Sequence, residues 1–397
     1  MRLNLLKIFI IIVTLLYQSI AYSKATDKNE FNHKYLSNYF SALLSYDNQN
    51  NDRALEYFNS SKNLLNKHDK FLKEYVFSLV MDGQVSKAIK QIKYSKNENN
   101  SNYFETNLLL VLDSLNKKDF IKTSELLIDL EVFQEGGTYE FIIYETLKNY
   151  NHLFLNGIIE RPNQNFGRLS LITNAFQNCF LNSNNTKSHF INLINSVEGD
   201  YSRYLFFYLA NVIENKDYES AIQIASTIDP LTSDLLIAQA KKWIDKLNFK
   251  KFKKHFSCKQ ETDILGEFFF LISSLYSSQE EYEKSNFYFN ISNYLNPKFY
   301  FNLSLLAEDY LFNGNFDSSR KILEKFDEKD EIYNWHKIKK IAQIINKQQN
   351  NDQSLKFVEN KFLKFKKPST RILFDMANIY KNYKKYKKAI EYYSIVL

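Results

Sequence analysis

Glycine and proline are scarce in this chain, with 8 and 4 occurrences in 397 residues. Both residues mark turns, and glycine also lets a backbone pass close to a phosphate group. We therefore expect few tight turns in this chain and no glycine-rich loop of the kind that binds nucleotides. Hydrophobic residues make up 44% of the chain and include many Leu, Ile, Phe and Tyr, which suits closely packed helices. We expect an all-helical fold.

Cysteine is scarce as well. Cys179 and Cys258 have neither CxxC nor Cys/His spacing, so zinc binding and redox chemistry are not indicated. A disulfide between them is possible in an oxidising compartment, but it would cross about 79 residues. In an array of stacked repeats that distance exceeds two repeats. We expect free, buried thiols.

Catalytic and metal-binding patterns are missing from the sequence. The six histidines stand alone, with no second histidine three or four residues away: His33, His68, His152, His189, His255 and His336. There is no G-x-S-x-G, no phosphate-binding glycine loop and no kinase-like motif set. Carboxylate pairs such as Glu280 and Glu281 fall at expected turns, where solvation explains them. We expect no enzyme activity, no cofactor and no metal.

A strong charge of one sign is absent too. The chain carries 52 Lys and Arg against 45 Asp and Glu, a formal charge of +7. The densest basic run, residues 250–254, is short, whereas nucleic-acid binding calls for a dense basic face. A solvated helix end is the simpler interpretation, and no nucleic-acid partner is expected.

The first 21 residues have the pattern of a secretory signal peptide. A basic start with Arg2 and Lys7 precedes an apolar segment at residues 8–16, and Ser19 and Ala21 place small residues where a signal peptidase cleaves. An uncleaved anchor is the alternative, although the apolar segment is shorter than the ~20 residues that span a bilayer. We expect export to the periplasm or cell envelope, with residues 22–32 as a flexible lead-in.

Helical periodicity is clearest at residues 268–297 and repeats in the next segment. Large apolar residues recur at helical spacing in two blocks joined by a short polar break, which predicts a helical hairpin. Four pairs of similar residues lie about 34 positions apart: Ser273 and Ala307, Tyr276 and Tyr310, Tyr282 and Phe316, Ser285 and Ser319. This period is typical of solenoids built from paired helices.

A small residue in the second helix of each expected hairpin can be followed along the chain. These residues are Ala54, Ala88, Thr123, Ser188, Ala221, Ser285, Ser319 and Ala389. Gly83 and Lys118 fall at the turns between helices, and Gly136, Gly137 and residues 161–165 interrupt the pattern. We expect repeats at 33–134, degenerate helical repeats with a possible hinge at 135–200, and repeats at 201–397, the last one truncated.

The pattern resembles the tetratricopeptide repeat family, in an exported bacterial form. The unit that begins at Gly266 fits best, with Phe269, Ile272, Ser273, Tyr276, Tyr282, Ser285, Phe289, Ser292 and Pro297. The last unit offers Leu373, Met376, Ala377, Tyr380, Tyr386, Ala389 and Tyr393. The resemblance implies an all-α, right-handed superhelical solenoid of helix-turn-helix repeats, about eleven units in all, several of them degenerate.

The resemblance also implies a concave groove lined by the first helix of each unit. In the N-terminal half the matching positions are mostly apolar: Tyr39, Leu43, Tyr46, Lys73, Phe77, Leu108 and Leu112. They could equally pack inside a tightly wound superhelix. In the last units the positions are polar and basic: Lys339, Gln343, Asn346, Arg371, Phe374, Asn378 and Lys381. Some family members clamp the terminal carboxylate of a peptide with such Lys and Asn residues, but the full clamp pattern is absent here.

These observations favour a non-catalytic scaffold that binds a protein or peptide partner in the periplasm or cell envelope. One alternative is the recruiting arm of a larger enzyme, such as a transferase, whose catalytic domain lies beyond residue 397. Another is a membrane-tethered assembly factor that keeps its N-terminal segment. The chain stops inside the second helix of a clear repeat, which favours a fragment over an end covered by another chain. The sequence identifies neither the partner nor the oligomeric state.

Overall fold

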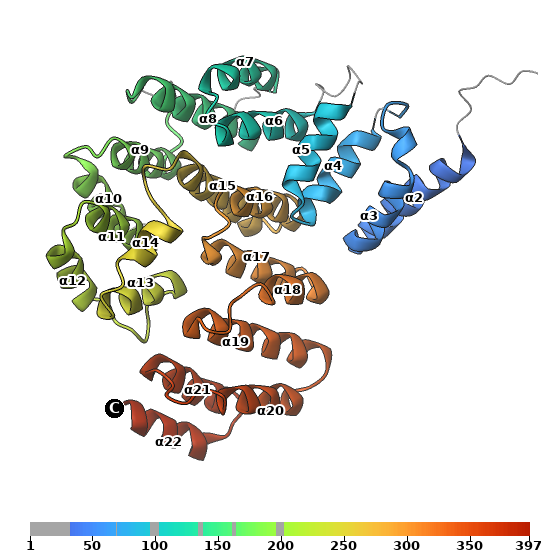
Figure 1. The fold of residues 1–397 in the computed structure, drawn as a ribbon. Helices are drawn as coiled ribbons and strands as arrows, with labels where there is room; N and C mark the ends of the chain where they lie inside the picture. Colours follow the sequence, from blue (N-terminus) through green and yellow to red (C-terminus); the bar gives the residue numbers. More distant parts are fainter. Residues whose placement is uncertain (1–31, 69, 96–102, 134–137, 161–163, 196–201) are drawn as a thin grey trace, which may run out of the picture. The chain divides into compact units, whose positions relative to one another are not determined.

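The computed structural model describes residues 32–68, 70–95, 103–133, 138–160, 164–195 and 202–397 (Figure 1). This described part contains 21 α-helices, one short 3-10 helix and no β-strand, so the all-helical prediction is confirmed. Within it no helix has the length and apolar character needed to cross a membrane. The predicted signal peptide and nearly all of the lead-in lie outside the described residues.

The chain divides into two compact units, Met1–Phe71 and Leu72–Leu397. The described part of the first unit holds α2 (His33–Asp47), α3 (Asn51–Ser60) and the 3-10 helix η1 (Lys62–Leu64). Its core is aromatic: the Tyr39 ring lies 6.2 Å from Phe58, 4.8 Å from His68 and 5.5 Å from Phe71. Ala54 is fully buried where α3 meets α2.

The second unit consists of helices joined mostly by short turns. Their bounds are α4 (Phe71–Met81), α5 (Val85–Tyr94), α6 (Phe104–Asn116), α7 (Phe120–Glu131), α8 (Tyr139–Asn156), α9 (Arg168–Phe180), α10 (Thr186–Ile194), α11 (Tyr204–Glu214), α12 (Tyr218–Ser226), α13 (Leu235–Asp245), α14 (Lys250–His255), α15 (Glu261–Ser278), α16 (Tyr282–Leu295), α17 (Tyr300–Phe312), α18 (Phe316–Leu323), α19 (Glu331–Gln348), α20 (Asn351–Phe362), α21 (Thr370–Asn382) and α22 (Tyr386–Val396). The predicted hairpin at residues 268–297 is α15 with α16.

One turn type recurs between paired helices. A residue with positive φ ends the first helix, and the next N–H donates to the carbonyl five positions back at 2.8 to 3.1 Å, as in a Schellman cap. Several of these left-handed residues follow one another at about 34 positions: Gln49, Gly83, Lys118, Asn182, Lys216, Leu247, Glu280, Gly314 and Lys384. The predicted turns at Gly83 and Lys118 are confirmed.

The residue after the left-handed position often caps the second helix. Asn50, Asp119, Asp217 and Asn315 each accept the N–H three residues later at 3.1 to 3.2 Å. A carboxylate or carboxamide oxygen there satisfies one of the orphan amides of the new helix. A single short segment therefore ends one helix and starts the next.

The small residues predicted for the second helices lie at helix contacts, with one exception. Ala54, Ala88, Thr123, Ala221, Ser285, Ser319 and Ala389 are at most 3% exposed. Ser188 was the wrong choice, because it is exposed and its hydroxyl donates to Asn185 O at 2.8 Å. Thr186 is the buried residue of α10, and its hydroxyl donates to Asn178 O of α9 at 3.0 Å.

In helical-repeat arrays each repeat generally contacts only its neighbours in sequence, but the second unit also has contacts between distant hairpins. The α15–α16 hairpin contacts α17, and it also contacts α5 and α6 from far earlier in the chain (Figure 1). The ring of Phe77 stacks on Phe287 at 4.7 Å, and Lys321 pairs with Asp82 at 2.6 Å. These contacts join segments more than 200 residues apart. The chain curves enough for its early and late helices to touch.

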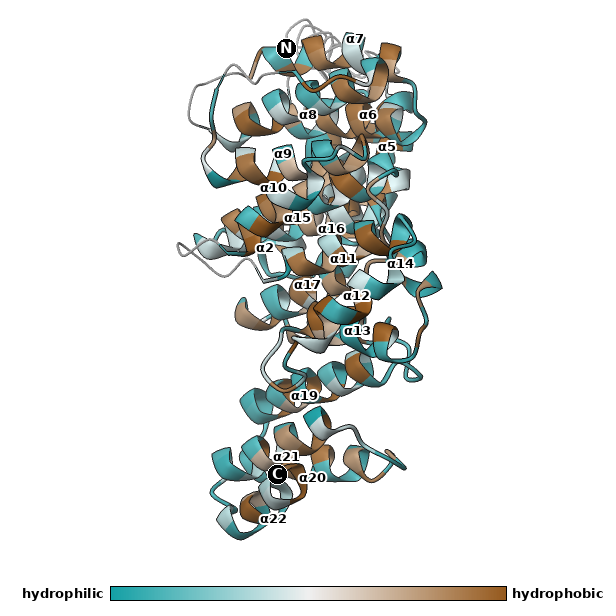
Figure 2. Ribbon diagram, turned by 90° about the vertical axis from the view of Figure 1, so that its left-hand side faces the viewer, coloured by the Kyte–Doolittle hydropathy of each residue, from teal (hydrophilic) through white to brown (hydrophobic). Residues whose placement is uncertain are grey.

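In Figure 2 apolar (brown) and polar (teal) residues are mixed along most of the helices, and α19 is mainly polar. Phe269, Ile272 and Ile291 of the central hairpin are fully buried. The last two hairpins have a core of their own, formed by Trp335, Ile338, Ala342, Leu355, Val358, Ile372, Met376, Tyr380 and Ala389.

The prediction of free thiols is wrong. Cys179 of α9 and Cys258, just after α14, form a disulfide with their Cα atoms 5.6 Å apart. After the short helix α14 the chain turns back over α11, and the Phe256 ring packs 4.7 Å from Phe207 and 5.9 Å from Phe176. This return brings the two cysteines together although more than two repeat lengths of sequence separate them.

Candidate functional site

Two neighbouring cavities open on the first helices of the late hairpins. The first, about 300 Å³, is lined by Asp234, Leu235, Phe301, Ser304, Leu305, Glu308, Ile332, Trp335, His336, Lys339, Ser369, Arg371 and Ile372. The second, about 390 Å³, is lined by Lys339, Ala342, Gln343, Asn346, Asn351, Val358, Asp375, Asn378, Ile379, Asn382 and Tyr383. Because Lys339 lines both cavities, they form one surface along α19.

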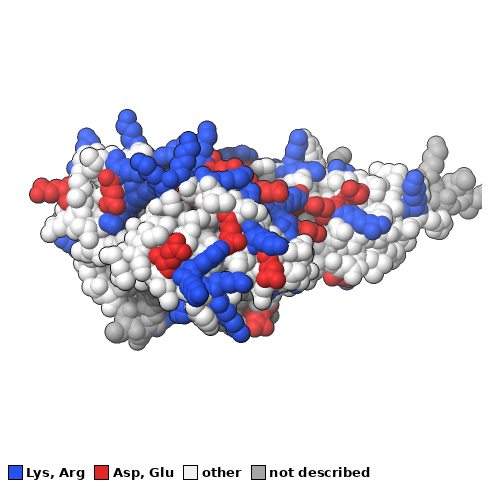
Figure 3. All heavy atoms as spheres, turned by 90° about the horizontal axis from the view of Figure 1, so that it is seen from below, with Lys and Arg blue, Asp and Glu red and all other residues white. Residues whose placement is uncertain are grey.

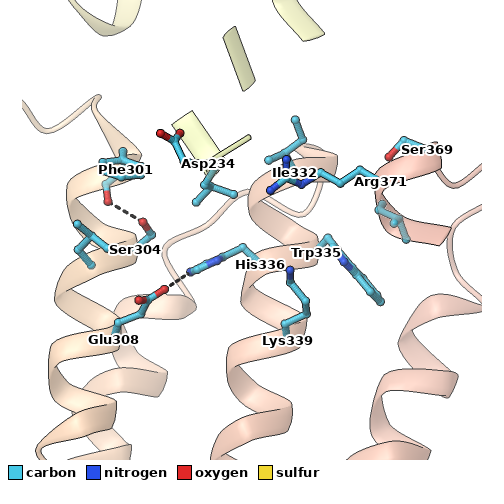
Figure 4. Close-up of a pocket in the computed structure, with 13 residues that line it drawn as sticks. Asp234, Phe301, Ser304, Glu308, Ile332, Trp335, His336, Lys339, Ser369 and Arg371 are labelled. Atoms are coloured by element: carbon cyan, nitrogen blue, oxygen red, sulfur yellow. Dashed lines mark hydrogen bonds and ion pairs between the residues drawn. The ribbon is translucent and has the colours of Figure 1, made fainter. Parts of the chain in front are cut away.

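The first cavity has apolar walls because α17, α19 and α21 lie side by side (Figure 4). Phe301 and Leu305 come from α17, Ile332 and Trp335 from α19, and Ile372 from α21. Ligand sites commonly combine such walls with a few polar groups that fix orientation. Here the polar groups come from the same helices and from Asp234, the N-cap of α13.

His336 is the most deeply buried titratable group that lines the first cavity. Burial, together with Lys340, Lys339 and Arg371, lowers the pKa of His336 to about 3, so the imidazole is neutral at physiological pH. Its Nε2 lies 3.6 Å from Glu308 Oε1, beyond hydrogen-bond distance, and has no hydrogen-bond partner among the described residues. Glu308 pairs instead with Lys340 at 2.9 Å.

The two cations of the first cavity are held by the protein itself. Lys339 Nζ lies 2.7 Å from Asp375 Oδ2, and the same oxygen accepts the Trp335 indole N–H at 2.8 Å. Arg371 donates to Pro230 O at 3.1 Å and to Ser233 Oγ at 3.4 Å. Arg371 thereby ties α21 to the segment before α13. Both positive groups of the cavity are therefore already paired with the protein: Lys339 with a carboxylate, and Arg371 with a carbonyl and a hydroxyl.

Carboxamides line the second cavity. They are Gln343 and Asn346 of α19, Asn351 at the start of α20, and Asn378 and Asn382 of α21. Asn378 Oδ1 accepts the Tyr393 hydroxyl at 2.7 Å, which fixes that amide. The Tyr383 hydroxyl at the edge of the cavity donates to Ser354 Oγ at 2.8 Å.

The structure brings most of the predicted C-terminal groove residues together. Lys339, Gln343, Asn346 and Asn378 line the second cavity, and Arg371 with Lys339 lines the first. Phe374 lines neither cavity and packs its ring 5.8 Å from Tyr393. Lys381 is exposed and lines neither cavity. Whether any of these residues binds a partner stays a prediction.

The predicted N-terminal groove residues lie mainly in packing contacts. Tyr39 is buried in the core of its unit, and Leu43 and Tyr46 are partly buried. In the second unit Phe77 stacks on Phe287, and the Lys73 ammonium lies 5.1 Å from the centre of the Tyr103 ring. Leu108 and Leu112 are fully buried. Within each unit, this placement agrees with the alternative that these residues serve packing.

Sequence reasoning missed several residues of the first cavity. His336 was taken as an isolated histidine, and Glu308 and Trp335 were not singled out; neither was Asp375 of the second cavity. One signal was available: Trp335 and Lys339 are four positions apart on α19 and therefore share a face. No signal in the sequence indicated that α13 would close the cavity from outside the late hairpins.

No acidic, histidine or cysteine group of three or more is placed to hold a metal ion within the described residues. On the face drawn in Figure 3, acidic side chains lie among the basic ones. The described surface in this view is thus of mixed sign and lacks the uniform basic character of a nucleic-acid interface.

Comparison of the sequence with protein-family models and with curated proteins found no match.

Proposed function

We propose that this protein is a non-catalytic scaffold of tetratricopeptide-like repeats that binds a protein or peptide along α19. The observation that carries the proposal is the pair of cavities that share Lys339. They combine apolar walls, cations that are already paired within the protein, and carboxamides, and these groups come mainly from α17, α19, α20 and α21. Such a surface offers both packing and hydrogen bonds to a chain laid along it.

The repeat architecture is supported by local geometry. Left-handed turn residues recur at intervals of about 34 residues in several places. The described helices form ten successive pairs, with α8 single, which is consistent with about eleven units. The right-handed superhelix remains part of the proposal, and the contact between α5 and α16 supports a tightly wound form.

We further propose that the protein acts in the periplasm or cell envelope after export. The Cys179–Cys258 disulfide supports this location, because disulfides persist in oxidising compartments. The membrane would then be engaged only through the transient signal peptide. Mass spectrometry of the exported protein tests the idea: cleavage after Ala21 gives a chain that begins at Tyr22, whereas a retained N-terminus contradicts it.

Selection from a random peptide library tests the binding function. The exported chain is immobilised, and enriched peptides are measured by calorimetry against wild type and Gln343→Trp, which fills the second cavity from an exposed position. We expect the variant to weaken binding at least about tenfold, roughly 1.4 kcal/mol. The matched control is Asn360→Trp, an exposed carboxamide of α20 outside both cavities. No enrichment, or equal loss in both variants, contradicts the proposal.

A further inference from the structure

We propose that the second cavity recognises the main-chain amide groups of an extended peptide segment and does not require a charged terminus. The inference rests on the proposed function and specifies the ligand chemistry of the same surface. It is carried by three features of the described residues: free carboxamides, a neutralised lysine, and the spacing of amides along one helix.

The carboxamides of the cavity have hydrogen-bonding capacity left over. The side chains of Gln343, Asn346 and Asn382 make no hydrogen bond within the described part of the chain, and all three residues are exposed. Each carboxamide both donates and accepts. A peptide group does the same through its N–H and C=O. Asn378 uses its Oδ1 for Tyr393, which leaves its Nδ2 as a donor toward a ligand carbonyl.

The charge of Lys339 is already matched inside the protein. Its ammonium lies 2.7 Å from Asp375, whose carboxylate is also held by the Trp335 indole. A ligand carboxylate would have to compete with Asp375 for this ammonium. Charge therefore gives little selectivity for an acidic terminus, and the neutral hydrogen-bonding groups dominate the cavity.

The spacing of the amides fits an extended chain. Asn378 and Asn382 are one helical turn apart on α21, a rise of about 6 Å. Two residues of an extended peptide span about 6.7 Å. A segment running along the space between α19 and α21 would thus present every second peptide group to successive carboxamides. Peptide groups in between would face away.

The test uses peptides enriched by the wild-type protein in the selection above. Each is made with free ends, with acetyl and amide caps, and as a series with one N-methyl group at successive positions. Binding is measured by calorimetry at about 50 and about 500 mM NaCl, where screening differs strongly. The protein variants are Asn378→Ala/Asn382→Ala and the matched control Asn360→Ala on α20.

We expect capping and salt to change Kd by less than about threefold, because the cavity does not bind a charged peptide terminus. N-methylation at alternate positions and the double variant should each weaken binding about tenfold or more, while Asn360→Ala binds as wild type. Three results would overturn this inference and leave the scaffold function intact: loss of affinity when the peptide ends are capped, weaker binding at high salt, or unchanged binding with every N-methylated peptide. Failure to enrich any peptide overturns both.

Discussion

Among the described residues, Arg203 and Glu267 form the most deeply buried ion pair. Their side chains are 13% and 1% exposed, and the two guanidinium nitrogens lie 2.9 and 3.0 Å from the two carboxylate oxygens. The Arg203 guanidinium also stacks 3.8 Å from the centre of the Phe270 ring. Burial raises the pKa of Glu267, and Arg203 opposes that rise. Each charge depends on the other to remain inside the protein.

Replacing Arg203 by Met should therefore destabilise the fold by about 3 to 5 kcal/mol. The carboxylate of Glu267 would be left buried without a counter-charge, so its pKa would rise further and the variant should be more stable near pH 5 than near pH 8. Urea denaturation at both pH values measures this. The double variant Arg203→Met/Glu267→Gln should recover most of the loss; a double variant no more stable than the single one contradicts the argument.

Asp263 makes the stability of the protein depend on pH. Burial raises its pKa from 3.8 to about 7, and Glu214 and Glu261 add to the rise, against the Ser257 N–H and Lys298. Between pH 3.8 and about pH 7, the Asp263 carboxyl is protonated in the folded protein but ionised in the unfolded chain. Stability contributed by this site is therefore present below about pH 4 and is lost as pH rises toward 7.

The variant Asp263→Asn should remove this loss, since the amide oxygen can still accept the Ser257 N–H now held at 2.9 Å. We expect it to exceed wild type by about 1 to 3 kcal/mol above pH 7.5 and to match it near pH 4. Urea midpoints across the pH range test the prediction. A constant difference between the two proteins at all pH values would assign the effect to packing instead.

At the scale of the helical hairpin, small residues set the distance between paired helices. The buried Ser319 hydroxyl of α18 donates to Ala307 O of α17 at 2.7 Å, and Ser354 of α20 makes the same contact with Ala342 O of α19. Larger side chains at these positions would push the paired helices apart.

Ser319→Ala should cost about 1 kcal/mol, the hydrogen bond alone. Ser319→Leu should cost about 1 to 3 kcal/mol more, because the added carbons have no space. Ser188→Leu is the matched control, since this serine was predicted to hold the same role yet is exposed. Its free energy of unfolding should change by less than about 0.5 kcal/mol. Equal losses in both leucine variants would refute the spacing role.

Periodicity predicted the hairpins well because each is specified locally. The second helices begin at Val85, Phe120, Tyr218, Tyr282, Phe316 and Tyr386, where turn, cap and apolar spacing agree. It failed at Ser188, where a degenerate repeat offered two small residues two positions apart. The predicted interruption at 136–137 and most of the one at 161–165 lie outside the described residues. Lys339, Gln343, Asn346, Arg371 and Asn378, which line the two cavities, were predictable from their positions in the first helices. The place of His336 in the first cavity was not predictable, because its burial depends on neighbouring hairpins.

At the scale of the whole second unit, sequence could not predict which distant segments meet. The curvature of a repeat array is the sum of small rotations between successive hairpins. The 34-residue period of the sequence gives no information about these rotations. For this reason the spatial separation of Cys179 and Cys258 was misjudged, and the sequence left open whether Phe77 lines a groove or packs in the interior.

The disulfide should contribute strongly to stability because it closes a loop with a separation of 79 residues. Chain-entropy estimates give about 4 kcal/mol for Cys179→Ala/Cys258→Ala. Both cysteines are at most 1% exposed, so reductant should break the bond only when the protein unfolds. Mass spectrometry after thiol labelling, with and without urea, tests this. Rapid labelling of the native protein, or a double variant as stable as wild type, would contradict the assignment.

Contact between early and late helices gives the last prediction. Phe77 of α4 stacks on Phe287 of α16, and Met81 O accepts hydrogen bonds from Asn290 and from Tyr310 at 3.3 and 3.2 Å. Phe77→Asp places a charge against an aromatic ring in this contact, which should separate α4 and α5 from α16 while each hairpin keeps its own turn and caps.

Hydrogen exchange should then rise in residues 72–94 and 282–295 and stay unchanged in α19 to α22, whose core is separate. Phe312→Asp, an aromatic position that is 63% exposed, should leave exchange as in wild type. If the two variants gave the same pattern, or if exchange rose equally throughout the chain, the early and late helices would not form the specific contact described here. Because the proposed peptide site lies on α19 and α21, Phe77→Asp should also leave peptide affinity unchanged, which separates winding of the repeats from recognition.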